Sequence, residues 1–174
     1  MKVQFLLLAG VLSCSAVWAA DETSTHPVTE DGVVKIVWQN PKDFRDIKSS
    51  GEVQSRYETR LFETLTKNIN KEAAKILKPN QKLEMMVTDV DLAGDMRPTF
   101  GATANDLRVV KDIYPPRITF SYQVLENDKV IVAGDEKLSD MGFLTGIQPL
   151  NDKPFMYETQ MLNDWLKKTI APKI

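Results

Sequence analysis

Residues 82–95 read KLEMMVTDVDLAGD and residues 113–122 read IYPPRITFSY, and these two segments decide the fold. In the first segment, alternating apolar residues change parity between Val87 and Val90. Such a slip indicates a β-bulge near Thr88–Asp89, or a strand that is covered on both sides. In the second segment apolar and polar residues alternate strictly, which predicts a strand with one buried face. Residues 96–111, between the two strands, lack clear periodicity and are predicted to form a long loop, of a kind that is often functional.

The flanking sequence predicts the remaining elements. Residues 33–38 (VVKIVW) form a β-branched strand, and apolar residues spaced by four predict a helix over residues 51–77. Ser49 and Glu52 have the spacing of a capping box at its start. A turn at residues 126–128 leads into a return strand over residues 130–138.

A final helix is predicted after residue 153, with Pro154 in its first turn and Asn151 or Asp152 near its cap. Its expected buried face consists of Met161, Leu162, Trp165, Leu166 and Ile170. We expect both Trp38 and Trp165 to lie in the core. The element order is then β-α-β-β-β-α, which predicts a single α+β domain over residues 33–174. We expect a two-layer sandwich in which a mixed sheet carries both helices on one face.

The N-terminus has the anatomy of a secretory signal peptide. Lys2 precedes an apolar run, and small residues before Asp21 predict cleavage after Ala19. Residues 20–32 are polar and are predicted to be a mobile leader. The alternative is a lipoprotein box ending at Cys14, which would be lipidated. We favour a periplasmic or extracellular protein with no transmembrane span after cleavage.

Four motifs resemble a family of short secreted proteobacterial proteins called domain of unknown function 3016. They are VVKIVWQNPKDF (33–44), VTDVDLAGD (87–95), DLRVVKDIYPPRITFSY (106–122) and DEKLSDMGF (135–143). The resemblance covers residues 33–143. It implies a bacterial exported protein without an established activity, and it supplies no catalytic or binding residues.

Composition excludes several chemistries. The net charge of −2 does not suggest nucleic acid as a partner. His26, the one histidine, lies in the predicted leader, so a histidine-based triad or zinc site is not expected. No phosphate-binding glycine loop occurs, and we expect no cofactor.

Two charged clusters remain as candidates for a site. Asp89, Asp91 and Asp95 could bind a hard cation such as Ca²⁺ or Mg²⁺. The alternative, which we favour, is that they bond loop amides and pair with arginines at a strand end. The second cluster could form an anion- or peptide-binding groove, or an ion-pair network that holds the long loop. It comprises Arg108, Lys111, Asp112, Tyr114 and Arg117.

Three functions fit these observations. The first is a non-catalytic exported module that binds an envelope protein or assists envelope assembly, which an open strand edge would favour. The second is a protein that binds a small ligand or a divalent cation through the three aspartates. The third is a carboxylate-based hydrolase, which the small domain makes the weakest of the three.

Overall fold

The computed structural model describes residues 26–99, 106–145 and 153–174. Its main sheet has five strands in the order β1-β2-β3-β6-β7. These strands are β1 (Val28–Asp31), β2 (Val34–Trp38), β3 (Gln81–Asp91), β6 (Arg117–Glu126) and β7 (Lys129–Ser139). The pair β2–β3 is parallel and the other pairs are antiparallel, so the predicted mixed sheet is confirmed.

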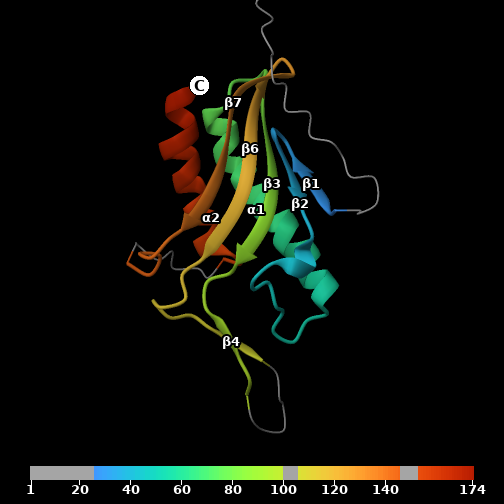
Figure 1. Ribbon diagram of the computed structural model, residues 1–174, viewed down its shortest axis with the longest axis vertical. Helices are drawn as coiled ribbons and strands as arrows, with labels where there is room; N and C mark the ends of the chain where they lie inside the picture. Colours follow the sequence, from blue (N-terminus) through green and yellow to red (C-terminus); the bar gives the residue numbers. More distant parts are fainter. Residues whose placement is uncertain (1–25, 100–105, 146–152) are drawn as a thin grey trace, which may run out of the picture.

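Two helices, α1 (Gln54–Ile76) and α2 (Met156–Trp165), cover one face of this sheet (Figure 1). A π-helical turn (Leu166–Ile170) and a 3-10 turn (Ala171–Lys173) continue α2. A short 3-10 turn (Pro41–Asp43) follows β2. The α+β fold with both helices on one face is therefore confirmed, and it explains why apolar residues alternate along β6: only one face is covered.

Aromatic side chains form the centre of the core between the two layers. Trp38 stacks on Phe62 of α1 with ring centroids 4.3 Å apart. Trp165 of α2 meets the edges of Phe120 and Tyr122 at 4.8 and 5.0 Å. Both tryptophans are buried, as predicted. Burial of each such side chain stabilises the fold by about 1.5–3 kcal/mol.

The predicted β-bulge is confirmed. The register between β3 and β6 shifts between Val87 and Asp89, so Thr88 is the additional residue. Val87 and Val90 are both buried, although they stand three positions apart, because the bulge restores the inward orientation after Thr88. Both sequence segments on either side of the bulge therefore contribute to one core.

The prediction of a mobile leader over residues 20–32 is wrong for residues 28–31. They form β1, which pairs with β2. The side chain of Thr29 explains the pairing: its Oγ1 accepts a hydrogen bond from Trp38 Nε1 at 2.8 Å and lies 2.6 Å from Thr66 Oγ1. These partners are distant in sequence, so a short polar segment gains strand structure only in the folded protein. Residues 20–25 lie outside the described residues, as do the predicted signal peptide and Cys14.

The predicted helix starts also need correction. The helix predicted from residue 51 begins at Gln54, and Val53 at its N-cap makes no side-chain hydrogen bond. The Ser49 hydroxyl donates to the carbonyl oxygen of Glu52 and accepts from its backbone N–H, in a turn that precedes the helix. Pro154 likewise precedes α2, whose N-cap is Phe155. Asn151 and Asp152 lie outside the described residues.

The segment predicted as a loop over residues 96–111 contains a second, two-stranded sheet. It pairs β4 (Asp95–Arg97) with β5 (Leu107–Val109), and the β4–β5 unit projects beyond the end of the main sheet (Figure 1). Residues 100–105 between them are not among those described. In the described ranges, no helix has both the length and the hydropathy of a membrane-spanning helix.

Candidate functional site

The bulge in β3 sets the direction of two predicted site residues. Asp89 and Asp91 flank the buried Val90, so both carboxylates face away from the helical layer. Asp89 lies opposite Thr119 and Asp91 opposite Arg117 on β6. The strand pairing thus brings Asp91 and Arg117 together, and Arg117 Nη1 donates to Asp91 Oδ2 at 2.9 Å.

Residues 41–48, which lie between β2 and α1, complete this region. Phe44 and Ile47 are buried and anchor this segment to the core. Between them, the backbone of Asp46 pairs with the end of β3: Asp46 N donates to Val90 O at 3.1 Å, and Leu92 N donates to Asp46 O at 3.0 Å. This docking places Arg45 beside the carboxylates of β3.

Arg45 and Arg117 share the carboxylate of Asp91. Arg45 Nη1 lies 3.5 Å from Asp91 Oδ2, and its Nη2 lies 3.3 Å from Asp89 Oδ2. The Arg45 backbone N–H also donates to Asp89 Oδ1 at 2.9 Å. The side chains of Arg45 and Arg117 are 56% and 42% exposed, whereas that of Asp91 is 13% exposed. A mostly buried carboxylate therefore orients two guanidinium groups that remain open to solvent. We call Arg45, Asp91 and Arg117 the arginine pair site.

A cleft of about 270 Å³ opens at the arginine pair site. Its lining comprises Arg45, Asp46, Lys48, Asp91, Gly94, Asp95, Met96, Tyr114, Pro115 and Arg117. Four of the eight residues predicted for a site, namely Asp91, Asp95, Tyr114 and Arg117, therefore meet here. Sequence reasoning missed Arg45 and Lys48, because only the docking of residues 41–48 brings them to this place.

Residues of the β4–β5 unit form one wall of this cleft, and the charged groups of this wall are paired with each other. Asp95 forms an ion pair with Arg97 at 2.8 Å. Arg97 also donates a hydrogen bond to the Tyr114 hydroxyl, and its guanidinium lies 5.6 Å from the centre of that ring. Gly94 closes the wall with φ of +92°, where its N–H donates to Tyr114 O at 3.0 Å. Asp95 is thus neutralised by a cation on its own strand.

Arg108 lies outside this cleft and clamps the β4–β5 unit to the domain. Its guanidinium donates to both carboxylate oxygens of Asp46 at 2.9 and 3.1 Å, and to Lys48 O at 3.1 Å. Lys111 and Asp112 are exposed in the turn before Tyr114, and neither lines the cleft.

The three aspartates that the sequence offered as cation ligands are each paired with an arginine. Across the described ranges, no group of three or more His, Cys, Asp or Glu side chains could hold a metal ion. Asp89, Asp91 and Asp95 each bond an arginine instead. The cation-binding hypothesis therefore has no support in the arrangement of these side chains.

A second pocket, of about 370 Å³, was not predicted. Its polar floor is Glu158 of α2, which is 2% exposed and whose Oε1 accepts a hydrogen bond from Ala93 N–H at 2.8 Å. We call it the Glu158 pocket. Its lining comprises Tyr57, Leu92, Ala93, Arg108, Val110, Lys153, Phe155, Met156, Tyr157 and Glu158.

Burial shifts the pKa values of two groups that line this pocket, Glu158 and Tyr57. It raises the pKa of the Glu158 carboxyl above its ordinary value, and the Ala93 N–H and the charge of Arg108 oppose that rise. Burial likewise raises the pKa of the Tyr57 hydroxyl. The sequence contains one sign of this buried acid: Glu158 precedes Met161, Leu162 and Trp165 by three, four and seven positions, on the apolar stripe of the helix.

A two-layer α+β domain with a polar cleft and a buried glutamate defines a structural class without defining an activity. The family description "Protein of unknown function (DUF3016)" matches residues 32–168, and the chain belongs to that family. Comparison with curated proteins finds no match, and comparison with solved structures finds none either.

Proposed function

We propose that the protein is an exported, non-catalytic binding module that recognises an anionic group through the arginine pair site. The observation that carries the proposal is the shared use of Asp91 by two exposed guanidinium groups. Each arginine has five N–H donors, and Arg117 uses one of them on Asp91. The remaining donors suit the paired oxygens of a carboxylate or phosphate.

The charges of the cleft support an anion as the ligand. Asp46 is engaged by Arg108, and Asp95 is engaged by Arg97. Lys48 adds a further cation to the lining. Asp89 and Asp91 likewise offset the charges of Arg45 and Arg117, so Lys48 leaves the cleft with a small excess of positive charge, which favours an anion.

The same pairing argues against catalysis at this cleft. Each carboxylate of the cleft is bonded to a guanidinium, which competes with a substrate for the oxygens that a general acid or base would use. The sequence contains one histidine, His26, and Asn40 N donates to its Nδ1 at 3.3 Å. A carboxylate-based hydrolase is therefore not the function that this geometry favours.

The test is calorimetric titration of the chain after residue 19 with inorganic phosphate and with succinate. Arg45→Gln and Arg117→Gln together should abolish the binding of whichever anion binds the unaltered chain. Arg56→Gln is the matched control, since Arg56 is an exposed arginine of α1 that does not line the cleft. Failure of both anions to bind, or equal binding by the double variant, would contradict the proposal.

An envelope protein as the partner has separate support in β7. In the described part of the chain, β7 pairs on one side only, with β6. Val130 and Ile131 are 53% and 42% exposed on this eleven-residue edge strand. An open edge can accept an extended segment of a partner, although the charges at Asp135 to Lys137 restrict this to the first half of β7. Site-specific cross-linking from Ile131, with Val28 of the other edge as the control, tests this form of binding.

Export is part of the same proposal and rests on the sequence of residues 1–19. Cleavage after Ala19 would release the chain into the periplasm, and lipidation of Cys14 is the alternative. N-terminal sequencing of protein from cell fractions distinguishes the two. A mature chain beginning at residue 20 is expected, and Cys14→Ser should leave its fractionation unchanged. Full-length protein in the cytoplasmic fraction would contradict export.

A further inference from the structure

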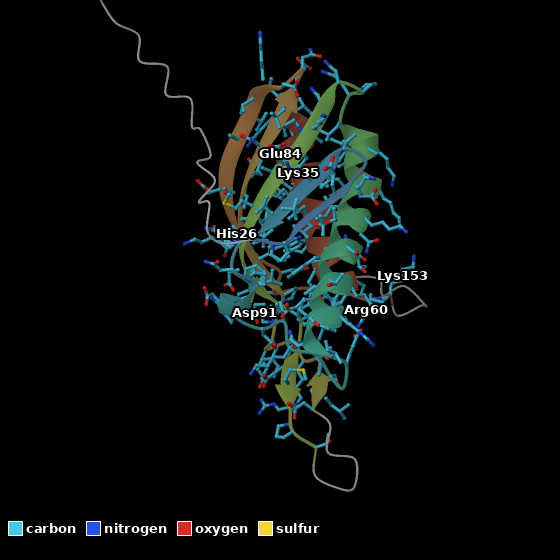
Figure 2. All side chains as sticks on the ribbon, turned by 90° about the vertical axis from the view of Figure 1, so that its right-hand side faces the viewer. His26, Lys35, Arg60, Glu84, Asp91 and Lys153 are labelled. Carbon is cyan, nitrogen blue, oxygen red and sulfur yellow. The ribbon has the colours of Figure 1, made fainter. Side chains whose placement is uncertain are left out.

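The Glu158 pocket lies apart from the arginine pair site. Arg60 and Lys153 lie toward the side of α1 in Figure 2, whereas Asp91 lies toward the other side. The two cavities share no lining residue. A ligand of the Glu158 pocket therefore occupies a different cavity from the anion site proposed above, with the Asp46–Arg108 pair between the two.

The pocket has one acidic residue, and two of the three cations around it are paired with acidic residues outside the pocket. Arg108 is held in bidentate contact by Asp46. Arg60, above the aromatic wall, forms an ion pair with Glu52 at 2.6 Å. Lys153 is exposed at the start of the α2 segment. Glu158 is thus the buried charge-bearing group that lacks an ion pair among these residues.

The walls of the pocket suit an apolar body that carries a cation. The rings of Tyr57 and Phe155 meet edge to face at 5.7 Å. The Arg60 guanidinium already lies over both rings, at 5.2 and 5.6 Å from their centres. Aromatic faces attract cations in this way, and Leu92, Val110 and Met156 add apolar surface.

The backbone at the pocket is held in an uncommon conformation. Phe155 has φ of +56°, a left-handed conformation that is costly for a residue with a Cβ and a ring. Such residues cost about 1–3 kcal/mol and cluster at ligand-binding places. Here Phe155 is the N-cap residue of α2, and its ring packs against Tyr57. Glu158, in the first turn of α2, lines the same pocket.

We propose that the Glu158 pocket binds a protonated amine with a compact apolar or aromatic body. The ammonium group pairs with the Glu158 carboxylate, and the body fills the space between Tyr57, Phe155 and Met156. A buried carboxyl without a cation favours its neutral form; a bound ammonium favours the ionised form. Amine binding therefore releases a proton from the protein whenever Glu158 begins protonated.

This coupling predicts that amine affinity rises with pH while Glu158 loses its proton. Arg108 is held as a cation by its two hydrogen bonds to Asp46, and Tyr57 titrates only at alkaline pH because burial raises its pKa. Arg60 and Lys153 are the other charged groups at the pocket. Glu158 is therefore the group whose titration governs binding in the acidic to neutral range.

Three matched probes test the proposal by calorimetry: phenethylamine, phenethyl alcohol and phenylacetate. They share the aromatic body and differ in charge. The amine should bind at least about tenfold more tightly than the alcohol, and phenylacetate should bind weakest. Equal affinity for amine and alcohol, tighter binding of phenylacetate, or no binding of any probe would overturn the proposal.

Variants locate the binding and separate it from the anion site. Glu158→Gln should reduce amine affinity to that of the alcohol, whereas Glu63→Gln, a change of an exposed glutamate on α1, should leave it unaltered. Arg45→Gln with Arg117→Gln should also leave amine binding unaltered. Undiminished amine binding by Glu158→Gln would refute the assignment. Should that variant not fold, the comparison of the three probes on the unaltered chain still decides the question.

Discussion

The Arg108–Asp46 ion pair should contribute more to stability than a shorter ion pair on the surface. The perturbation is a double-mutant cycle with Asp46→Asn and Arg108→Met, singly and together. The two side chains are 16% and 18% exposed and meet through two hydrogen bonds. The control cycle, Glu52→Gln and Arg60→Met, removes a pair that is closer, at 2.6 Å, but 35% and 46% exposed.

The magnitude follows from burial. At an effective dielectric constant near 20, the Coulomb attraction at 2.9 Å is about 6 kcal/mol, and desolvation offsets most of it. Two charge-assisted bonds then leave a coupling of about 1.5–3 kcal/mol. The exposed control should give about 0.2–1 kcal/mol despite its shorter distance.

Urea unfolding of the four chains of each cycle measures both couplings. High salt should weaken the Glu52–Arg60 coupling more than the Asp46–Arg108 coupling, since buried pairs are screened less. A loss of 2 kcal/mol should lower the melting temperature by about 4–8 °C in a chain of this size. A coupling for Asp46–Arg108 no larger than that of the control would refute the view that it clamps the β4–β5 unit.

Three further predictions concern single residues. Gly94→Ala should destabilise the fold by more than about 1 kcal/mol in thermal melting, because φ is +92° and a Cβ would lie 2.8 Å from the carbonyl oxygen of Val109 in β5. As the control, Gly142→Ala should be nearly neutral, because a Cβ there would make only ordinary van der Waals contacts. Trp165→Phe should cost about 1 kcal/mol less than Trp38→Phe, because the buried Trp165 indole N–H has no hydrogen-bond partner among the described residues whereas that of Trp38 donates a hydrogen bond; equal losses on unfolding in urea would contradict this. Burial holds the pKa of Glu158 above 4.5 in the folded state, so the folded protein binds more protons and this contribution to stability falls as pH rises from about 4.5 through the folded pKa. Melting temperatures across this pH range should lose that part of the slope in Glu158→Gln, and an unchanged slope would count against the buried acid.

Much of the fold could be predicted because periodicity reports burial directly. The alternation along β6 and the four-residue steps of α1 each follow from one covered face, which is a local property of the chain. The parity slip in β3 predicted the bulge for the same reason. By contrast, β1 and the β4–β5 unit are held by distant partners such as Thr66 and Asp46. Short polar segments give no periodic signal of such contacts.

The candidate site divides in the same way. Asp91, Asp95, Tyr114 and Arg117 could be selected in advance because they flank two core strands that pair with each other. Arg45 could not, since it reaches Asp91 only after residues 41–48 dock on the end of β3. Glu158 is not part of the predicted core face, because a single charged residue beside an apolar stripe is as compatible with the exposed edge of a helix as with burial.

The sequence by itself determined the two-layer architecture and the change of parity that marks the bulge, because both depend on which backbone positions face the core. Only the tertiary structure decided which charges neutralise one another. The three aspartates pair with arginines, and Glu158 is a buried acid at the floor of a pocket. Ion pairing and desolvation depend on distances between segments far apart in the chain, and those distances exist only once the layers have packed.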